Sequence, residues 1–221
     1  MQTQQLSFAD IRPRGPRLVV LPDSARVEEW LLAAARRQGF VAGRPACTLA
    51  ELERELVREA RRAGKCPPSA SPHALMLALR EAAREHSHGR FVRIREQAGY
   101  ARALGDLLAT LTQGLLDPAD LARLDVPERA SELGRTLAAA RGLLDRAGLV
   151  EPNRAVRIAV DQLAQGMPLP PLLARAAEVE FDGILDWTPL RLRLAVVLAS
   201  RLRIRIRLPW SADRPDLTEA L

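Results

Sequence analysis

Residues 178–209 read EVEFDGILDWTPLRLRLAVVLASRLRIRIRLP, which is a pattern of strand, helix and strand. Val179 and Phe181 are the apolar residues of the first extended segment. Thr188 and Pro189 then form an N-cap and first-turn pair, because proline is tolerated where the first amide of a helix has no partner. A strand, a crossover helix and a second strand predict a parallel unit with a right-handed connection.

The second extended segment carries arginine at every second position. These residues are Arg201, Arg203, Arg205 and Arg207. Successive side chains of an extended chain point to opposite faces, so the period of two predicts a strand with one arginine face and one aliphatic face. A strand with one polar face is expected near the edge of its sheet. We interpret the arginine face as a candidate for weak contact with DNA or with a protein partner.

Strand and helix also alternate near the N-terminus. Residues 18–21 are a continuous apolar run, which is typical of a strand covered on both faces. Asp23 can cap the helix that follows, and Gly39 ends it. Thr48 and Glu51 have the spacing of a capping box for a second helix. The chain is therefore expected to have an α/β fold. Its predicted parallel strands are residues 17–22, 45–49, 178–183 and 203–209.

The middle of the chain shows only helical periodicity. Apolar residues recur at helical spacing through several segments, and Asp117 with Pro118 marks the start of one of them. We expect three regions in chain order. They are a first part of the α/β core (1–66), a large all-α insertion (67–176) and a second part of the core (177–221).

Composition narrows the class of protein. Hydrophobic residues make up 48% of the 221 residues, as in a folded globular protein. The net charge of +6 and the isoelectric point of about 10.7 favour contact with nucleic acid. However, the arginines are dispersed among acidic residues, and Lys65 is the only lysine. A solvated basic surface is therefore an equally good interpretation of the charge.

Neither a membrane location nor a metal site is expected. The sequence lacks the apolar run of roughly 20 residues that spans a bilayer, and its start lacks the pattern of a secretory signal. Cys47 and Cys66 lie far apart and do not have the spacing of a zinc site. His86 and His88 form a pair without further ligands nearby in sequence, so we expect no metal there. These features predict a cytoplasmic protein.

Three stretches, taken in order, resemble AddB-type subunits of bacterial helicase–nucleases, a RecB/RecC-like family. Residues 180–210 contain DGILDWTPLRLRL, similar to the family's acidic turn and Thr-Pro-Leu helix. Residues 18–39 with 48–56 (LVVLPDSARVEEWLLAAARRQG and TLAELEREL) resemble its early strand and helices. Residues 99–121 (GYARALGDLLATLTQGLLDPADL) resemble its helical insertion. The resemblance implies a RecA-like, P-loop-like sheet core that is degenerate and truncated.

The resemblance also implies a degenerate acidic motif. P-loop helicases carry Asp-Glu-x-Gln-Asp at the end of a strand, where the acids hold magnesium and activate water. Asp182 and Asp186 fall on the two aspartate positions, while Gly183 replaces the glutamate and Leu185 replaces the glutamine. The sequence contains no GxxxxGK[ST] phosphate loop. We therefore expect no catalytic residue, no ATP binding and no cofactor in this segment.

Members of this family continue downstream into a nuclease domain with iron–sulfur cysteines. The resemblance thus implies that this chain is an N-terminal fragment or relic of a longer protein. The parent would be a subunit of an ATP-dependent exodeoxyribonuclease, and an iron–sulfur cluster would belong only to its downstream domain.

The expected function is that of a non-catalytic helicase-like module in DNA double-strand-break repair and recombination. Its expected partners are DNA, bound weakly and without sequence preference, and a helicase–nuclease partner subunit. The alternative is a purely structural, protein-interaction domain with no DNA role. A sheet edge exposed near residues 203–210 would also favour self-association.

Overall fold

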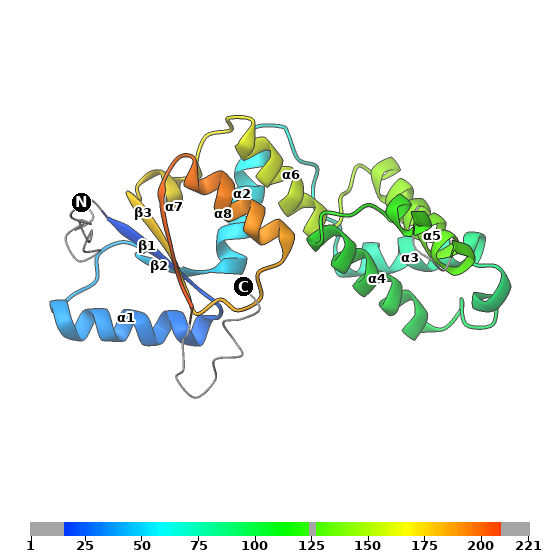
Figure 1. Cartoon of the computed structure of the whole chain (residues 1–221), viewed down its shortest axis with the longest axis horizontal. Coiled ribbons are helices and arrows are strands. Elements are labelled where there is room, and N and C mark those ends of the chain that lie inside the picture. The colour runs from blue at the N-terminus through cyan, green and yellow to red at the C-terminus, as the bar shows by residue number, and fades with distance from the viewer. Residues whose placement is uncertain (1–15, 124–126, 209–221) are drawn as a thin grey trace, which may run out of the picture. The chain divides into compact units, whose positions relative to one another are not determined.

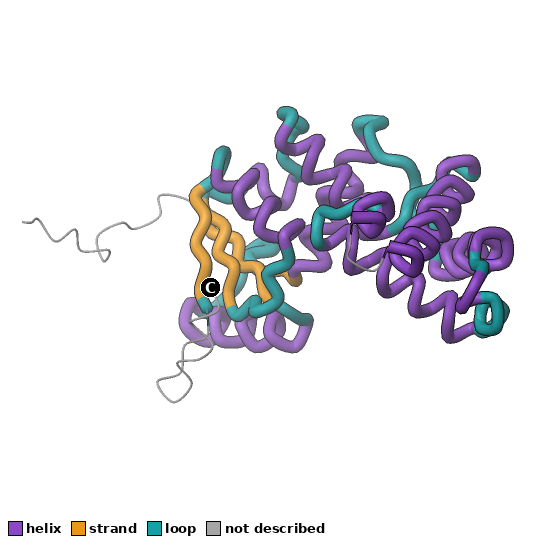
Figure 2. Tube along the Cα trace, turned by 45° about the vertical axis from the view of Figure 1, so that its right-hand side comes forward, coloured by secondary structure: helices purple, strands orange, loops and turns teal. Residues whose placement is uncertain are grey.

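The structure is a computed structural model that describes residues 16–123 and 127–208. Within these residues the chain forms a four-stranded, fully parallel sheet with the strand order β2-β1-β3-β4. The four strands lie side by side in Figure 2. Their bounds are β1 (Arg17–Leu21), β2 (Ala46–Thr48), β3 (Glu178–Asp182) and β4 (Arg203–Arg207). The predicted α/β class and all four predicted parallel strands are confirmed.

Helices make up most of the remaining described chain. The α-helices are α1 (Ser24–Gln38), α2 (Leu49–Arg62), α3 (Pro72–His86), α4 (Ala98–Gln113), α5 (Pro127–Arg146), α6 (Pro152–Ala164), α7 (Pro171–Ala174) and α8 (Pro189–Ala199). Two short 3-10 helices are η2 (Gly89–Phe91) and η3 (Pro118–Arg123). The helix expected to begin at Pro118 is thus a 3-10 helix rather than an α-helix. No helix among the described residues is both long and apolar enough to cross a bilayer.

The chain divides into two compact units. The sheet unit contains the described residues 16–53, 169–186 and 198–208. The helical unit contains the rest, including residues 187–197, which form most of α8. The boundaries between the units differ from the expected ones at residues 66 and 176. The first boundary lies inside α2, after residue 53, and the second lies before α7, which therefore belongs to the sheet unit.

In the sheet unit, α1 packs on one face of the sheet beside β1 and β2. Val19, Leu21 and Ala46 form a buried cluster on this face. Trp30 and Leu31 of α1 pack against that cluster, and Figure 1 shows α1 running alongside the strands. Helix α1 packs against the β1–β2 half of this face, and the β3–β4 half of the same face carries polar side chains.

Local signals in the sequence set the ends of α1. The Asp23 side chain accepts a hydrogen bond from the amide of Arg26 at 2.9 Å, which satisfies one of the free amides of the first turn. Gly39 ends the helix in the left-handed conformation, with φ of 80°. Both predicted caps are confirmed.

Helix α2 begins with the predicted capping box. The Thr48 amide donates to Glu51 Oε2 at 2.9 Å, and the Glu51 amide donates to Thr48 Oγ1 at 3.1 Å. The Thr48 backbone hydrogen bond holds the pKa of Glu51 below its ordinary value of 4.5, and nearby Arg44 lowers it further. The carboxylate therefore stabilises the fold more when it is ionised than when it is protonated.

This capping box gives a pH-dependent prediction. Thr48→Ala should lower the free energy of unfolding by about 1 kcal/mol at neutral pH. Glu51→Ala should also destabilise, and its difference from wild type should shrink as pH falls through the lowered folded pKa of Glu51. Urea denaturation at several pH values measures both effects. Glu28→Ala, on the exposed surface of α1, serves as the control; a Glu51 effect that is independent of pH would contradict the account.

Helices α3, α4 and α5 form the core of the helical unit. The largest fully buried side chains in this cluster are Leu79, Leu104, Leu108 and Leu137. Gly134 lets α5 approach η3 closely, since a Cβ atom there would lie 2.6 Å from the carbonyl oxygen of Pro118. The predicted all-α region therefore has an apolar core of its own.

Candidate functional site

The arginines of β4 face buried glutamates on β3. Parallel pairing places Glu178 opposite Arg203 and Glu180 opposite Arg205. Glu178 is 1% exposed, and its carboxylate lies 3.6 Å from Arg203 Nε and 3.4 Å from Arg205 Nε. These are ion pairs without hydrogen-bond geometry in the described structure. Both arginine side chains remain partly exposed, at 41% for Arg203 and 38% for Arg205.

Glu180 extends the same arrangement toward β1. Arg17 Nη1 donates a hydrogen bond to Glu180 Oε2 at 2.8 Å. Glu180 Oε1 lies 3.3 Å from Arg207 Nε, and Arg205 Nη1 lies 3.8 Å from Glu180 Oε2. We call these six side chains the arginine–glutamate ladder. They are Arg17, Glu178, Glu180, Arg203, Arg205 and Arg207.

Within the protein, the arginine face of β4 contacts the two buried glutamates of β3. Its four guanidinium groups and two carboxylates leave two positive charges in excess. The arginines of the ladder are 36–58% exposed at the side chain, whereas both glutamates are buried. Long arginine side chains commonly cover buried groups with their stems and keep their charged ends in water, and these exposures fit that arrangement. The face therefore has basic groups at its surface and acidic groups beneath them.

Strand β4 begins at Arg203, the first residue of its predicted range, and it does not include Arg201. Arg201 lies in the turn before it, because the Leu202 amide still donates to the Leu198 carbonyl at 2.8 Å and so completes the last turn of α8. The prediction that four arginines share one strand face is therefore wrong for Arg201. The other three lie on β4, as expected.

Strand β4 lies at one edge of the sheet in residues 16–123 and 127–208. Ile206 on its apolar face is 45% exposed, and Leu208 just beyond is 36% exposed. Phe181, which lies opposite Ile206 on β3, is buried. A second β4 added to this edge would place arginine beside arginine, and like charges directly opposite are unfavourable. The ladder therefore disfavours self-association through β4 pairing.

The acidic motif is not assembled into a phosphate or metal site among the described residues. Asp182 ends β3 and lies half-buried, whereas Asp186 lies exposed in the segment before α8. No group of three or more potential metal ligands converges in the part of the chain that the structure describes. Gly183 has φ of 72°, and its amide donates to the Arg207 carbonyl at 3.0 Å. The turn itself thus favours glycine at this position.

An open polar groove of about 590 Å³ lies between α1 and the ladder. Glu180, Asp182 and Arg207 line it from the sheet, and Arg26 and Arg37 line it from α1. Its mixture of acidic and basic groups can bind polar or charged ligands. Among the described residues that line it there is no histidine, cysteine or serine that could act as a nucleophile.

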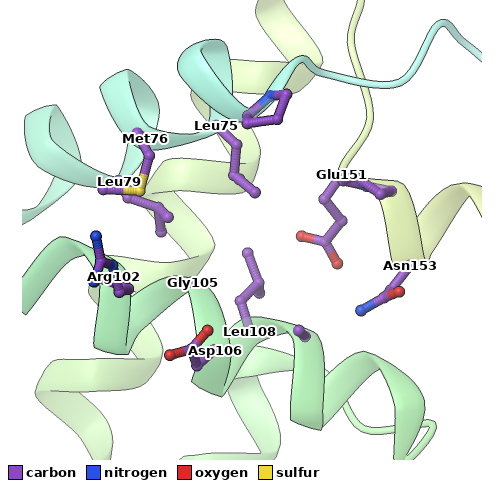
Figure 3. A pocket seen from close by; sticks show the side chains of 12 residues that line it. Leu75, Met76, Leu79, Arg102, Gly105, Asp106, Leu108, Glu151 and Asn153 are labelled. Atoms are coloured by element: carbon purple, nitrogen blue, oxygen red, sulfur yellow. The ribbon is translucent and has the colours of Figure 1, made fainter.

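The helical unit contains a second, mainly apolar pocket of about 300 Å³ (Figure 3). Leu75 and Leu79 of α3 and Leu108 of α4 line it, with Glu151 at one side. The Glu151 carboxylate is already engaged by Arg141 and Thr112 at 2.7 Å each. It is therefore not free to act as a general base in this pocket.

Arg141 is the centre of a buried polar cluster. Its guanidinium donates to Glu151 twice, to Thr112 Oγ1 at 2.7 Å and to Asp117 Oδ1 at 2.9 Å. Burial alone would lower the pKa of Arg141, but its hydrogen bonds and ion pairs with Glu151 and Asp117 outweigh burial and raise it. The cluster is structural, because every member is tied to another.

Neither cysteine has the environment of a reactive thiol. Cys47 on β2 is fully buried, and burial raises the pKa of its thiol to about 12. Burial also raises the pKa of Cys66. Both thiols are protonated at neutral pH, so they lack the thiolate required of a nucleophile or metal ligand.

Reasoning from sequence missed Glu178 and Glu180 as members of the site. The signal was present, since the acidic residues of β3 repeat with the same period of two as the arginines of β4. No protein-family model and no curated protein sequence matches this chain. The resemblance to AddB-type subunits remains a prediction that rests on the three segments that carry it.

Proposed function

We propose that this chain is a non-catalytic helicase-like module of a DNA break-repair helicase–nuclease in the cytoplasm. In this role it contacts DNA weakly and holds a partner subunit. The ladder is the main support, because β4 presents a row of arginine ends at a sheet edge. Successive arginines there are about 6.6 Å apart, from about 3.3 Å per residue of a parallel strand. Such a row can neutralise phosphates without reading bases.

The scaffolding part of this proposal has its own support. Glu178 and Glu180 offset half of the charge of the ladder arginines, which weakens attraction to phosphate. The same alternation at an edge strand suits contact with another protein. A purely protein-binding role is therefore the second candidate function, and the two differ in whether DNA binds at all.

The proposal predicts that ATP does not bind. A glycine-rich loop and its lysine hold the phosphates in P-loop enzymes, and the sequence has no such motif. Restoring the missing acid should not help, since Gly183→Glu supplies a carboxylate but no phosphate cradle. At φ of 72° the glutamate should also destabilise the turn by about 1–2 kcal/mol.

Isothermal titration calorimetry with ATP and magnesium tests this prediction on wild type and on Gly183→Glu. We expect no saturable heat for either protein. Gly183→Ala is the control that separates backbone strain from the added carboxylate. Saturable binding by wild type or by the glutamate variant would contradict the non-catalytic assignment.

A further inference from the structure

The outer edge of β4 has an unused row of backbone groups. The Arg207 carbonyl accepts from the Gly183 amide, so the backbone groups of Arg207 point toward the β3 side. Successive residues of a strand turn their backbone groups to opposite sides of the strand. The amides and carbonyls of Ile204 and Ile206 therefore point away from β3. No strand among residues 16–123 and 127–208 pairs with them.

Strand β3, which pairs with the inner side of β4, shows which side chains are complementary to those of β4. Glu178, Glu180 and Asp182 of β3 lie opposite Arg203, Arg205 and Arg207. On the other face, Val179 lies opposite Ile204 and Phe181 opposite Ile206. β3 thus places acids against the arginine row and apolar side chains against the isoleucines. A strand with the same alternation would complement the outer side of β4.

The exposed side chains at the outer edge favour the same chemistry. Arg203, Arg205 and Arg207 are 41%, 38% and 58% exposed, so their ends can reach a further strand. Ile206 presents a half-exposed apolar surface on the opposite face. Acidic residues at every second position would pair with the arginines, and the residues between them would cover Ile206.

We propose that β4 binds an extended segment of a partner protein whose residues alternate between acidic and apolar, and that this segment adds a fifth strand to the sheet. The proposal rests on the scaffolding role above and names its partner chemistry. A second copy fits poorly because its β4 brings arginine to arginine. The sequences of residues 1–15 and 209–221 contain no acids at alternate positions, so they do not supply this pattern. Main-chain hydrogen bonds would give affinity, and the alternating side chains would set the register.

The probe is a synthetic peptide with the β3 sequence of this chain, EVEFD, with blocked ends. Titration of the isotope-labelled full chain, followed by amide chemical shifts, should show weak saturable binding with shifts concentrated at residues 203–208. A peptide of the same composition with its three acids consecutive should bind at least tenfold more weakly. The EVEFD peptide with lysine at its three acidic positions should not bind.

One substitution separates strand pairing from simple charge attraction. Ile206→Pro removes an outward amide but leaves the amides that face β3, and proline is tolerated on edge strands. It should abolish peptide binding, whereas Ile206→Ala, which keeps the amide, should retain most of it. Circular dichroism confirms that both variants are folded. If the proline variant is unfolded, N-methylation of alternate peptide amides removes the same hydrogen bonds from the partner side.

Either of two kinds of result would overturn the inference. The first is that wild type shows no saturable binding of the EVEFD peptide. This result would overturn the inference even if another part of the chain or a second copy covered the edge of β4. The other is equal binding of the alternating and consecutive acidic peptides, or unchanged binding by Ile206→Pro, which would indicate charge attraction alone. Neither result bears on DNA or ATP binding, which are measured separately on the same chain.

Discussion

Replacing Arg141 by methionine is expected to lower the free energy of unfolding by about 3–5 kcal/mol. Arg141 is 9% exposed and Glu151 4% exposed, so the substitution leaves a carboxylate buried without its counter-charge. The Thr112 hydroxyl stays paired, because it can still donate its one proton either to the Leu108 carbonyl at 2.9 Å or to Glu151 Oε1 at 2.7 Å. The penalty therefore arises chiefly at Glu151. Chemical denaturation measured by circular dichroism gives the value.

A double variant tests the cause of that loss. Arg141→Met with Glu151→Leu should recover most of the stability, because replacing both members of a buried ion pair by apolar groups is often close to neutral. Arg157→Ala is the matched control, since within the described residues Arg157 contacts the cluster through Asp117, at 3.5 Å. It should cost less than about 1 kcal/mol. A double variant as unstable as Arg141→Met alone would contradict this explanation.

Neutralising the two buried glutamates of the ladder is expected to strengthen DNA binding close to tenfold at low salt. A carboxylate about 7 Å from a bound phosphate costs about 0.6 kcal/mol at the dielectric constant of water. Glu178→Gln with Glu180→Gln removes two such charges. The glutamine at 180 can still accept the hydrogen bond from Arg17. Fluorescence anisotropy with a labelled single-stranded oligonucleotide measures the change.

The control must change the net charge of the protein by the same amount as the ladder variant, which removes two negative charges. Glu81→Gln with Glu85→Gln does so on the exposed surface of α3, which belongs to the helical unit. It should alter affinity much less than the ladder variant. Equal gains for both double variants would mean that net charge, rather than the ladder, governs binding. No gain for the ladder variant would remove the reason to place DNA there.

Much of the sheet unit could be predicted because its signals are local. The apolar run before Asp23 predicted β1, one of the two inner strands, and the spacing of Thr48 and Glu51 predicted the start of α2. The alternation of residues 203–207 gave an edge strand. Each of these features depends on a few neighbouring residues. Local signals were therefore enough to predict where the strands and helices lie in the sequence. The return of strand and helix alternation after the helical region predicted that the four strands belong to one sheet.

The candidate site was harder to predict because it depends on contacts between distant segments. The burial of Glu178 follows from the register between β3 and β4, which no single segment specifies. Arg141 and Glu151 meet Thr112 only after α4, α5 and α6 have packed. Arg201 fits the period of its strand, yet it is retained by the last turn of α8. Alternation alone could not locate that boundary.

The most direct test of the central claim is the salt dependence of DNA binding by wild type and by Arg207→Gln. If the ladder neutralises about three phosphates, log affinity should fall with log salt at a slope of about −2. Affinity should then drop more than tenfold between about 50 and 200 mM salt. Arg207→Gln should reduce the slope by about 0.7, whereas Arg36→Gln on α1 should leave it unchanged. Salt-resistant or sequence-selective binding, or equal slopes for all three proteins, would contradict a weak phosphate contact through the arginine–glutamate ladder.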